Sequence, residues 1–129
     1  MKIDHLAIWV SNLNVIKDFY EKYFQASAGD LYNNPEKQFR SYFLSFPNSN
    51  TRLEIMAAPN VIDKIGIRGF EAGMAHFAIS VGSREMVDQL TEQLRSDQHS
   101  IVGEPRITGD GYYESVVLDP EGNRLEITA

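Results

Sequence analysis

Two histidines and two glutamates stand at matched places in this chain of 129 residues. His5 is followed by Leu-Ala-Ile, and His76, 71 positions later, is followed by Phe-Ala-Ile. Glu54 lies in Arg-Leu-Glu-Ile, and the same run recurs around Glu126, 72 positions later. Imidazole nitrogens and carboxylate oxygens are competent ligands for Ni, Zn, Co, Mn or Fe, and four of them leave positions for water or substrate. We therefore predict that these four side chains hold one divalent metal ion.

Each of these side chains also has an ordinary structural interpretation. A single histidine in a strand is usually hydrogen-bonded within the fold, and a glutamate between Leu and Ile is usually solvated or paired with a neighbouring arginine. The recurrence of both residue types at matched positions favours the metal. The third histidine, His99, has no counterpart in the other half of the chain, and we expect it at the surface.

Strand alternation places each of the four predicted ligands on one face of its strand. In the first strand His5, Ala7 and Trp9 point to one side, and the apolar residues between them point to the other. The segments around the other three ligands alternate in the same way. We therefore predict sheet that packs one apolar face against helices and carries the His and Glu side chains on the opposite face.

The segments between the ligands predict two similar modules, each with the element order βαβββ. Apolar residues at helical spacing predict one helix from Leu13 to Phe24 and a second from Gly82-Ser83 to about Ser96. Turn residues separate strand-like stretches, which we expect at 26–32, 39–46, 51–57, 101–107, 112–118 and 123–128. We predict a single domain, 1–129, with module 1 over 1–57, a linker over 58–73 and module 2 over 74–129.

Composition excludes several classes of function. A net charge of -6 argues against a nucleic-acid-binding protein, which normally presents a basic face. Because the chain has no cysteine, it has no disulfide, no thiolate metal site and no cysteine nucleophile. The apolar run at the N-terminus is short and contains charges, unlike a signal peptide or a membrane span. We therefore expect a cytoplasmic protein that does not act on a membrane.

On these residues the chain resembles the vicinal oxygen chelate superfamily, which includes glyoxalase I, fosfomycin-resistance thiol transferases, extradiol dioxygenases and bleomycin-resistance proteins. The resemblance covers the whole chain, and its most recognisable segments are 5–8, Phe19-Tyr20, 76–79 and 119–126. It implies an α+β fold in which two βαβββ modules form an open, barrel-like mixed sheet around a metal cleft. It also implies a small-molecule substrate and a homodimer, and some members complete the site across the subunit interface.

Within that superfamily, Glu54 resembles the carboxylate ligand of glyoxalase I, at a position where thiol transferases and extradiol dioxygenases have no ligand. The resemblance implies a lyase or isomerase that acts on a small α-oxo compound or its thiol adduct. In that reaction a metal acts as a Lewis acid, and Glu126, or alternatively Glu54, moves a proton between neighbouring carbons. One alternative is a fosfomycin-type thiol transferase, against which Glu54 counts. The other is a metal-free drug-binding protein, which would have no use for four matched ligands.

The residues expected to contact substrate differ from those of glyoxalases that use glutathione. Those enzymes have an Arg four residues after the first His and an Asn four residues after the first Glu, where this chain has Trp9 and Ala58. The thiol cosubstrate is therefore left open, and Trp9 either stacks on a flat or apolar substrate or fills the pocket. Further candidates, each with ion pairing, dimer contact or core packing as its alternative, are Arg52, Arg124, Tyr112 and Tyr113. The two tyrosines belong to the segment 103–114, which we expect to border the cleft.

Overall fold

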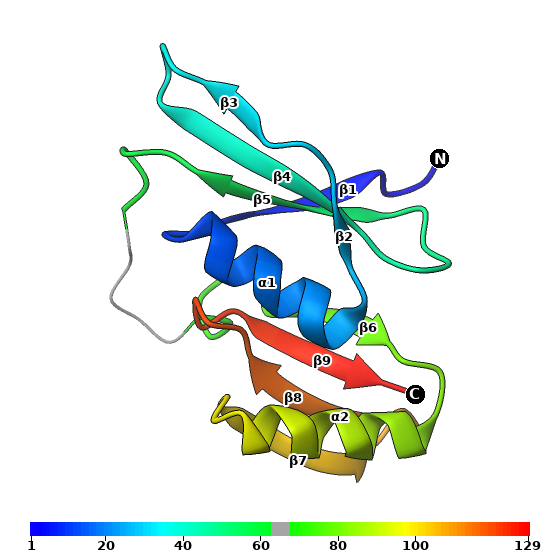
Figure 1. Ribbon diagram of the computed structural model, residues 1–129. Helices are drawn as coiled ribbons and strands as arrows, with labels where there is room; N and C mark the ends of the chain where they lie inside the picture. The colour runs from blue at the N-terminus through cyan, green and yellow to red at the C-terminus, as the bar shows by residue number, and fades with distance from the viewer. Residues whose placement is uncertain (63–67) are drawn as a thin grey trace. The chain divides into compact units, whose positions relative to one another are not determined.

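The computed structural model describes residues 1–62 and 68–129, which form two compact units, Met1–Lys64 and Ile65–Ala129 (Figure 1). Each unit has its own hydrogen-bonded sheet and its own helix. The predicted linker, 58–73, includes residues 63–67, which lie outside the described residues. The two units are described separately below.

The sheet of the first unit has the strand order β1-β5-β4-β2, and β3 also pairs with β4. Strand β1 is parallel to β5, and the other pairs are antiparallel. The elements of this unit are β1 (His5–Trp9), α1 (Leu13–Phe24), β2 (Ser27–Ala28), β3 (Tyr32–Asn34), β4 (Phe39–Ser45) and β5 (Arg52–Ala57). The first helix therefore has the bounds that the apolar spacing predicts.

The prediction of a single strand over 26–32 is wrong, because the segment forms two short strands that both pair with β4. Ala28 lies opposite Leu44, and Tyr32 lies opposite Ser41. Four steps along one segment thus match three along the other, so one residue is bulged out between β2 and β3. The bulge falls at Gly29-Asp30-Leu31, where turn-forming residues interrupt the extended run. A backbone hydrogen bond from Gly29 to Phe43, 3.0 Å long, keeps the segment on the sheet.

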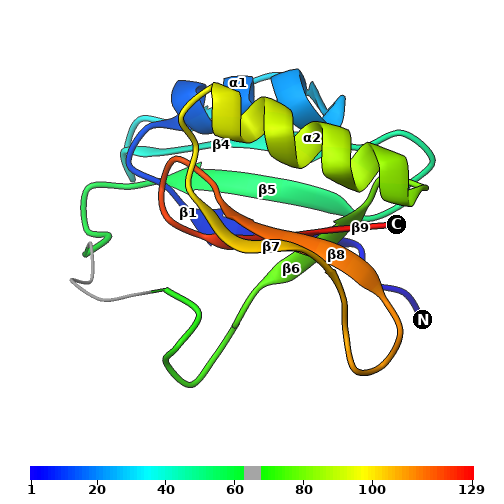
Figure 2. The ribbon, with the colours of Figure 1, turned by 90° about the horizontal axis from the view of Figure 1, so that it is seen from below.

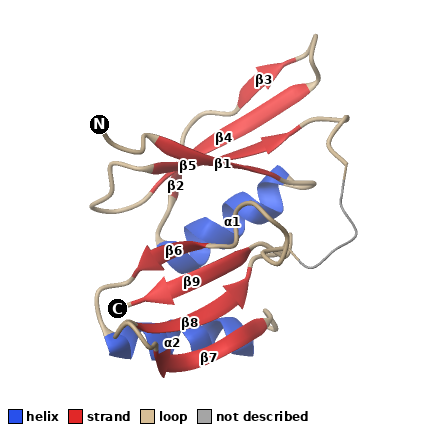
Figure 3. Ribbon diagram, turned by 180° about the vertical axis from the view of Figure 1, so that it is seen from behind, coloured by secondary structure: helices blue, strands red, loops and turns tan. Residues whose placement is uncertain are grey.

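Helix α1 lies against one face of this sheet, where it contacts β4 and β5 (Figure 3). Asn12 caps the helix, because its side-chain oxygen accepts hydrogen bonds from the backbone N–H groups of Asn14 and Val15. The residues that the helical spacing places on one face are all buried: Leu13, Ile16, Phe19, Tyr20, Tyr23 and Phe24. The helix ends at Gln25, which adopts a left-handed conformation.

The sheet of the second unit has the strand order β6-β9-β8-β7, again with one parallel pair, β6 and β9. Its elements are β6 (Phe77–Ser80), α2 (Arg84–Ser96), β7 (Ile101–Ile107), β8 (Tyr113–Leu118) and β9 (Arg124–Thr128). Ser83 caps α2 by accepting a hydrogen bond from the backbone N–H of Met86. Helix α2 runs alongside β7 and β8 (Figure 2).

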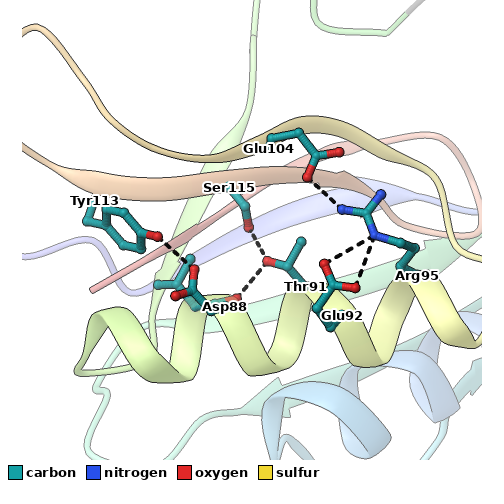
Figure 4. A network of polar contacts seen from close by, with 8 residues as sticks. Asp88, Thr91, Glu92, Arg95, Glu104, Tyr113 and Ser115 are labelled. Atoms are coloured by element: carbon teal, nitrogen blue, oxygen red, sulfur yellow. Dashed lines mark hydrogen bonds and ion pairs between the residues drawn. The ribbon is translucent and has the colours of Figure 1, made fainter.

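Buried and exposed polar contacts hold α2 against its sheet (Figure 4). The Thr91 hydroxyl lies 2.7 Å from the Ser115 hydroxyl of β8 and 2.6 Å from the backbone oxygen of Val87, with Thr91 and Ser115 fully buried. At the surface, Arg95 lies 2.6 Å from a carboxylate oxygen of Glu104 in β7. These contacts fix which face of β8 meets the helix and therefore which face is left for the predicted site.

The α+β class predicted from the sequence is confirmed, and the second unit has the predicted order βαβββ. The first unit differs only in that its predicted second strand is divided into β2 and β3. The strands are mixed parallel and antiparallel, and hydrogen bonding divides them into two sheets without closing a barrel. None of the described helices is long and apolar enough to cross a membrane.

Candidate metal centre

The four predicted ligands lie on the faces of their sheets that the helices do not cover. In β5, Leu53, Ile55 and Ala57 are buried, whereas the alternate residues, Glu54 among them, are partly exposed. The same alternation holds in β9, where Leu125 and Ile127 are buried. In β1 and around β6 the alternating residues that include the histidines are exposed as well. Hereafter, the site face of each sheet is the face that carries its His and Glu.

In the first unit His5 and Glu54 form a close pair across two neighbouring parallel strands. His5 lies opposite Arg52 in the register of β1 and β5, and Glu54 is two residues farther along β5. Residues two apart in a strand share a face, so both side chains project from the site face. Their nearest atoms, His5 Nε2 and Glu54 Oε2, are 3.8 Å apart.

The second unit repeats this arrangement with His76 and Glu126. Phe77 lies opposite Leu125 in β6 and β9, so His76 is next to Arg124, and Glu126 is two residues farther along β9. His76 Nε2 lies 3.1 Å from Glu126 Oε2. The sequence repeat is thus also a structural repeat, with one His–Glu pair in each unit and the same register in both.

A carboxylate that the sequence analysis did not assign, Asp4, holds the ring of His5. Asp4 Oδ2 is 3.0 Å from His5 Nδ1 and 2.7 Å from Nη2 of Arg52. A hydrogen bond from His5 and a second from Arg52 lower the pKa of Asp4 below its usual value. An ionised carboxylate only accepts hydrogen bonds, so Nδ1 of His5 carries the proton and Nε2, on the side of Glu54, keeps a free lone pair in the neutral ring. An acid directly before a strand histidine is the sequence signal for this contact.

Phe43 of β4 supports the same group from the neighbouring strand. Its ring meets the ring of His5 edge-on, with centroids 5.3 Å apart, and the guanidinium of Arg52 lies 4.3 Å above it. Arg52 is thus engaged by both Asp4 and Phe43. This arrangement is the ion pairing that was the alternative to a substrate-binding role for Arg52.

Within the residues that the structure describes, the histidine of the second unit has no carboxylate in the position of Asp4. Ala75 precedes His76 where Asp4 precedes His5, so no carboxylate is available at that place in the sequence. Arg124, the counterpart of Arg52, lies with its guanidinium 4.9 Å above the ring of Phe70. The two halves therefore have the same pair of ligands but different surroundings.

The two pairs fit a divalent metal in both chemistry and spacing. Zinc binds nitrogen and oxygen ligands at about 2.1 Å, so two ligands of one ion lie roughly 3 to 3.5 Å apart at tetrahedral or smaller angles. The observed separations are close to this range, and 3.8 Å between His5 and Glu54 is too long for a hydrogen bond. Within the residues that the structure describes, no group of three or more His, Asp or Glu side chains gathers at one point. Each unit by itself therefore brings together two of the four predicted ligands.

Aromatic residues extend the site face of the first unit beyond the His–Glu pair. Trp9 lies opposite Met56, which lies opposite Ser41, which lies opposite Tyr32, so the four form a row across the sheet. The ring of Phe39 contacts Trp9 edge-on, with centroids 6.1 Å apart, and Tyr32, with centroids 6.0 Å apart. Trp9 and Tyr32 are 43% and 55% exposed. We name Trp9, Phe39 and Tyr32 the aromatic shelf.

The paired tyrosines predicted to border the cleft are separated by strand alternation. Tyr113 begins β8 and faces α2, where its hydroxyl donates a 2.7 Å hydrogen bond to Asp88 (Figure 4). The guanidinium of Arg84 lies 5.2 Å above the centre of the Tyr113 ring. The hydrogen bond to Asp88, with its negative charge, raises the pKa of Tyr113. The structure thus places Tyr113 on the face opposite Glu126, while Tyr112 lies in the exposed turn between β7 and β8. His99, expected at the surface, is partly exposed.

Comparison with known proteins identifies the family. A model of the Glyoxalase/Bleomycin resistance protein/Dioxygenase superfamily matches residues 2–127. The chain belongs to this superfamily. The family resemblance inferred from the sequence motifs is therefore confirmed. Membership of this superfamily accounts for the two-module fold.

Solved structures of several superfamily members are similar to this chain. A glyoxalase family protein from Enterococcus faecalis is 23% identical, with a TM-score of 0.77 over 99% of this chain and 97% of that chain. Glyoxalase I from Zea mays is 25% identical, with a TM-score of 0.80 over 98% of this chain and 44% of that chain, so this chain spans less than half of the maize protein. A fosfomycin resistance protein from Listeria monocytogenes is 17% identical, with a TM-score of 0.77 over 99% of this chain and 92% of that chain. A search of curated protein sequences finds no match.

Proposed function

We propose that this superfamily member is a metal-dependent lyase or isomerase of glyoxalase I type, acting on a small α-oxo compound or its thiol adduct. The observation that carries the proposal is the His–Glu pair that recurs with one register in both units. We propose that His5 and Glu54 from one module and His76 and Glu126 from the other are ligands of a single divalent ion. Ni, Zn, Co and Mn all suit this set of nitrogen and oxygen ligands.

Glu54 is the residue that supports glyoxalase chemistry over other reactions of the superfamily. With it the site contains two carboxylates, so one can move a proton while the other remains a ligand. The similarity to maize glyoxalase I, over nearly the whole of this chain, agrees with this choice. A thiol transferase needs no proton-transferring carboxylate at this position, and a drug-binding protein needs no ligands at all.

The residues of the chain have distinct roles in the proposed reaction. A bound divalent ion would supply Lewis-acid stabilisation of the negative charge that develops on the substrate oxygens. Asp4 fixes the His5 ring with Nε2 free to act as a ligand. Glu126 is the first candidate for the base that takes the proton from the carbon beside the carbonyl and returns it to the neighbouring carbon, and Glu54 is the second. Both glutamates are less than one-fifth exposed, which limits their contact with water.

The substrate is proposed to lie along the site face of the first unit beside the aromatic shelf. Ala7 of β1 lies opposite Glu54 of β5, and Trp9 is two residues beyond Ala7. The backbone of Trp9 is therefore about 7 Å along the strand from the position opposite Glu54. Trp9 and Tyr32 offer exposed ring surface to a flat or apolar substituent. Because Trp9 and Ala58 stand where glutathione-dependent enzymes have Arg and Asn, we propose a thiol other than glutathione.

Metal content and turnover together test the proposal. We expect about one divalent ion for each complete set of four ligands, and turnover of methylglyoxal with one or more low-molecular-weight thiols after reconstitution with Ni, Zn, Co or Mn. Glu54→Gln and Glu126→Gln are expected to reduce kcat by about 100-fold or more, since each removes a ligand or the base. Glu36→Gln, at an exposed position of the first unit, is the matched control and should leave turnover unchanged.

The same measurements separate the competing functions. Metal binding without turnover of any thiol adduct, but with opening of an epoxide by a thiol, would replace the isomerase with a fosfomycin-type transferase. A metal content below about half an ion per chain after mild purification would support the metal-free drug-binding function instead. The proposed homodimer is checked independently by sedimentation of the metal-loaded protein.

A further inference from the structure

The second unit has a buried carboxylate, Glu114, that the proposed reaction does not use. In β8 it is two residues before Val116, which lies opposite Glu126 in β9, so Glu114 projects from the same site face as Glu126. It is only 7% exposed. Burial first, and then the negative charge of Glu126, raise the pKa of Glu114, which agrees with the two carboxylates sharing this face. A buried carboxylate needs a partner, because removing a charge from water is costly.

That partner is Arg106 of β7, and the local structure of this strand determines where its guanidinium lies. Nη2 of Arg106 lies 3.2 Å from Oε1 of Glu114. The ladder between β7 and β8 is irregular between Gly103 and Arg106, and Nη1 of Arg106 would lie 3.1 Å from a side-chain carbon placed on Gly103. The same added carbon would lie 2.9 Å from Val116. Gly103 therefore leaves the space in which the guanidinium lies beside Val116, over the site face.

The guanidinium in this position retains unused hydrogen-bonding capacity. Arginine has five N–H donors in a fixed planar arrangement, and one of them is engaged by Glu114. The side chain of Arg106 is 52% exposed, whereas the side chain of Glu114 is almost fully buried. A carboxylate that holds one edge of a guanidinium leaves the other edge oriented for a second planar anion. The orientation of Arg106 therefore suits recognition as well as neutralisation.

The described part of the first unit, residues 1–62, shows no equivalent of this pair at the matching position. Glu114 lies opposite Thr128, two residues beyond Glu126, and Ser41 lies opposite Met56, two residues beyond Glu54. Ser41 is thus the counterpart of Glu114, and its neighbours on the site face are the rings of the aromatic shelf. One unit presents apolar rings beside its ligand pair, and the other presents a guanidinium. Among the described residues, the feature suited to an anionic group therefore belongs to the second unit.

We propose that Arg106 binds a carboxylate group of the substrate and that Glu114 is the positioning residue that holds the guanidinium over the site face. The inference rests on the proposed function, since it takes the His–Glu pairs as the reacting centre. The backbone of Arg106 lies two strand spacings across the sheet and two residues along it from that of Glu126, about 12 Å in all, and the two long side chains shorten this gap. The substrate class is therefore an α-oxo compound whose thiol adduct carries a carboxylate a few bonds from the reacting carbon.

A direct binding experiment tests the arginine without requiring turnover. The probes are (methylthio)acetate and its neutral counterpart (methylthio)acetamide, titrated into the protein as purified and after treatment with a chelator. The readout is the NMR signal of the Arg106 Nε–H group, together with the backbone amides of Gly103 and Val116. We expect saturable shifts with the acid that are at least tenfold weaker with the amide, because a charge-assisted, two-point contact is lost.

Three variants identify the group responsible. Arg106→Gln should abolish the discrimination between acid and amide, and Glu114→Gln should weaken binding of the acid severalfold while changing the Arg106 Nε–H signal of the free protein. Arg95→Gln is the matched control, because Arg95 pairs with acids on the helix side of the same unit and should bind the acid like the unmodified chain. Equal binding of acid and amide, or acid binding that survives Arg106→Gln in a folded protein, would overturn the proposal.

Turnover then separates this inference from the proposed function. With adducts of methylglyoxal, Arg106→Gln should raise KM about tenfold or more for mercaptoacetate and leave KM for 2-mercaptoethanol and kcat for both nearly unchanged. Selective carboxylate binding with no turnover of any adduct would refute the glyoxalase reaction and leave the arginine site supported. Turnover without preference for the carboxylate would refute the arginine site and leave the reaction supported.

Discussion

At the scale of single residues, the two histidines differ in what holds them. Asp4 accepts a hydrogen bond from His5 Nδ1 and also pairs with Arg52, so the ring of His5 has a fixed orientation. Ala75 stands at the matching place before His76. Outer partners of metal-binding histidines contribute to affinity by fixing the ring and its tautomer. We therefore expect the histidine of the first module to be better oriented for metal binding than that of the second.

Asp4→Asn is expected to weaken metal binding about 10-fold to 100-fold, the usual effect of removing the acceptor behind a histidine ligand. The amide can still contact Nδ1, but it carries no charge to support the ring or to hold Arg52. Competition with a chelating dye measures the dissociation constant for Zn or Co. Asp30→Asn, at an exposed position in the same unit, is the control. Equal affinities for the two variants would show that Asp4 has no role at the metal.

Trp9→Ala is expected to lower kcat/KM about 10-fold more for an adduct of phenylglyoxal than for the same adduct of methylglyoxal. The reason is that contact between two rings contributes about 0.5–1.5 kcal/mol beyond the apolar area that it buries. Metal affinity should not change, since Trp9 lies four residues beyond His5 along β1. Val15→Ala, which shortens an exposed apolar side chain on α1, is the comparison. A uniform loss for both substrates would mean that Trp9 only fills space.

At the scale of elements, patterns in the sequence predicted helices and faces better than contacts across strands. Capping residues and apolar spacing are local, so Leu13–Phe24 and its buried face were predicted correctly. The bulge between β2 and β3 depends on which backbone groups of β4 pair with each strand. This pairing cannot be predicted from a local sequence pattern. The sequence shows Glu114 as an acidic residue in an apolar strand. Its partner, Arg106, is eight residues away in sequence, on a neighbouring strand with irregular pairing. Register, which sets such contacts, is decided by the whole sheet.

A buried hydroxyl pair, Thr91 and Ser115, contributes to the attachment of α2 to its sheet, together with buried Val87, Leu90 and Leu94. Thr91→Val should destabilise the protein by about 1–3 kcal/mol, because it leaves the Ser115 hydroxyl buried without its side-chain partner. Ser115→Ala should have a similar effect, and the double variant should cost less than the sum of the two, since no unpaired hydroxyl remains. Urea denaturation measures all three. Additive losses would show that the two hydroxyls are not coupled.

At the scale of the whole molecule, the chain contains the same small module twice, and different side chains surround the His–Glu pair in each copy. The repeat accounts for why the fold and the two matched His–Glu pairs could be predicted from the sequence, because each module supports the interpretation of the other, whereas the shared metal remains a prediction. The differences between modules were less predictable. In the part of the chain that the structure describes, the contact of Asp4 with His5, the aromatic shelf and the Arg106–Glu114 pair each occur in one unit. Metal binding is proposed to depend on what the modules share, and substrate choice on how they differ.

If one ion takes ligands from both modules, the two pairs are not independent sites. His5→Ala and His76→Ala should then each reduce metal content nearly to zero, and the double variant should be no worse than either one. Two separate two-ligand sites would instead leave each single variant with about half of the metal. Two ligands from one module bind an ion weakly, since structural and catalytic sites of this kind use three or four. Metal analysis after gel filtration distinguishes the two cases.

Thermal unfolding provides the same test in terms of stability. An ion that binds only the folded protein raises the unfolding free energy by RT ln(1 + [L]/Kd), about 2.7 kcal/mol at 100 times Kd. The unmodified chain should show this gain, and either histidine variant should lose all of it rather than half. His99→Ala is the matched control, because His99 has no counterpart in the other module, and its metal-dependent gain should equal that of the unmodified chain. A gain that persists in both single variants would mean that the repeated His–Glu pairs bind separate ions, and the shared site would be refuted.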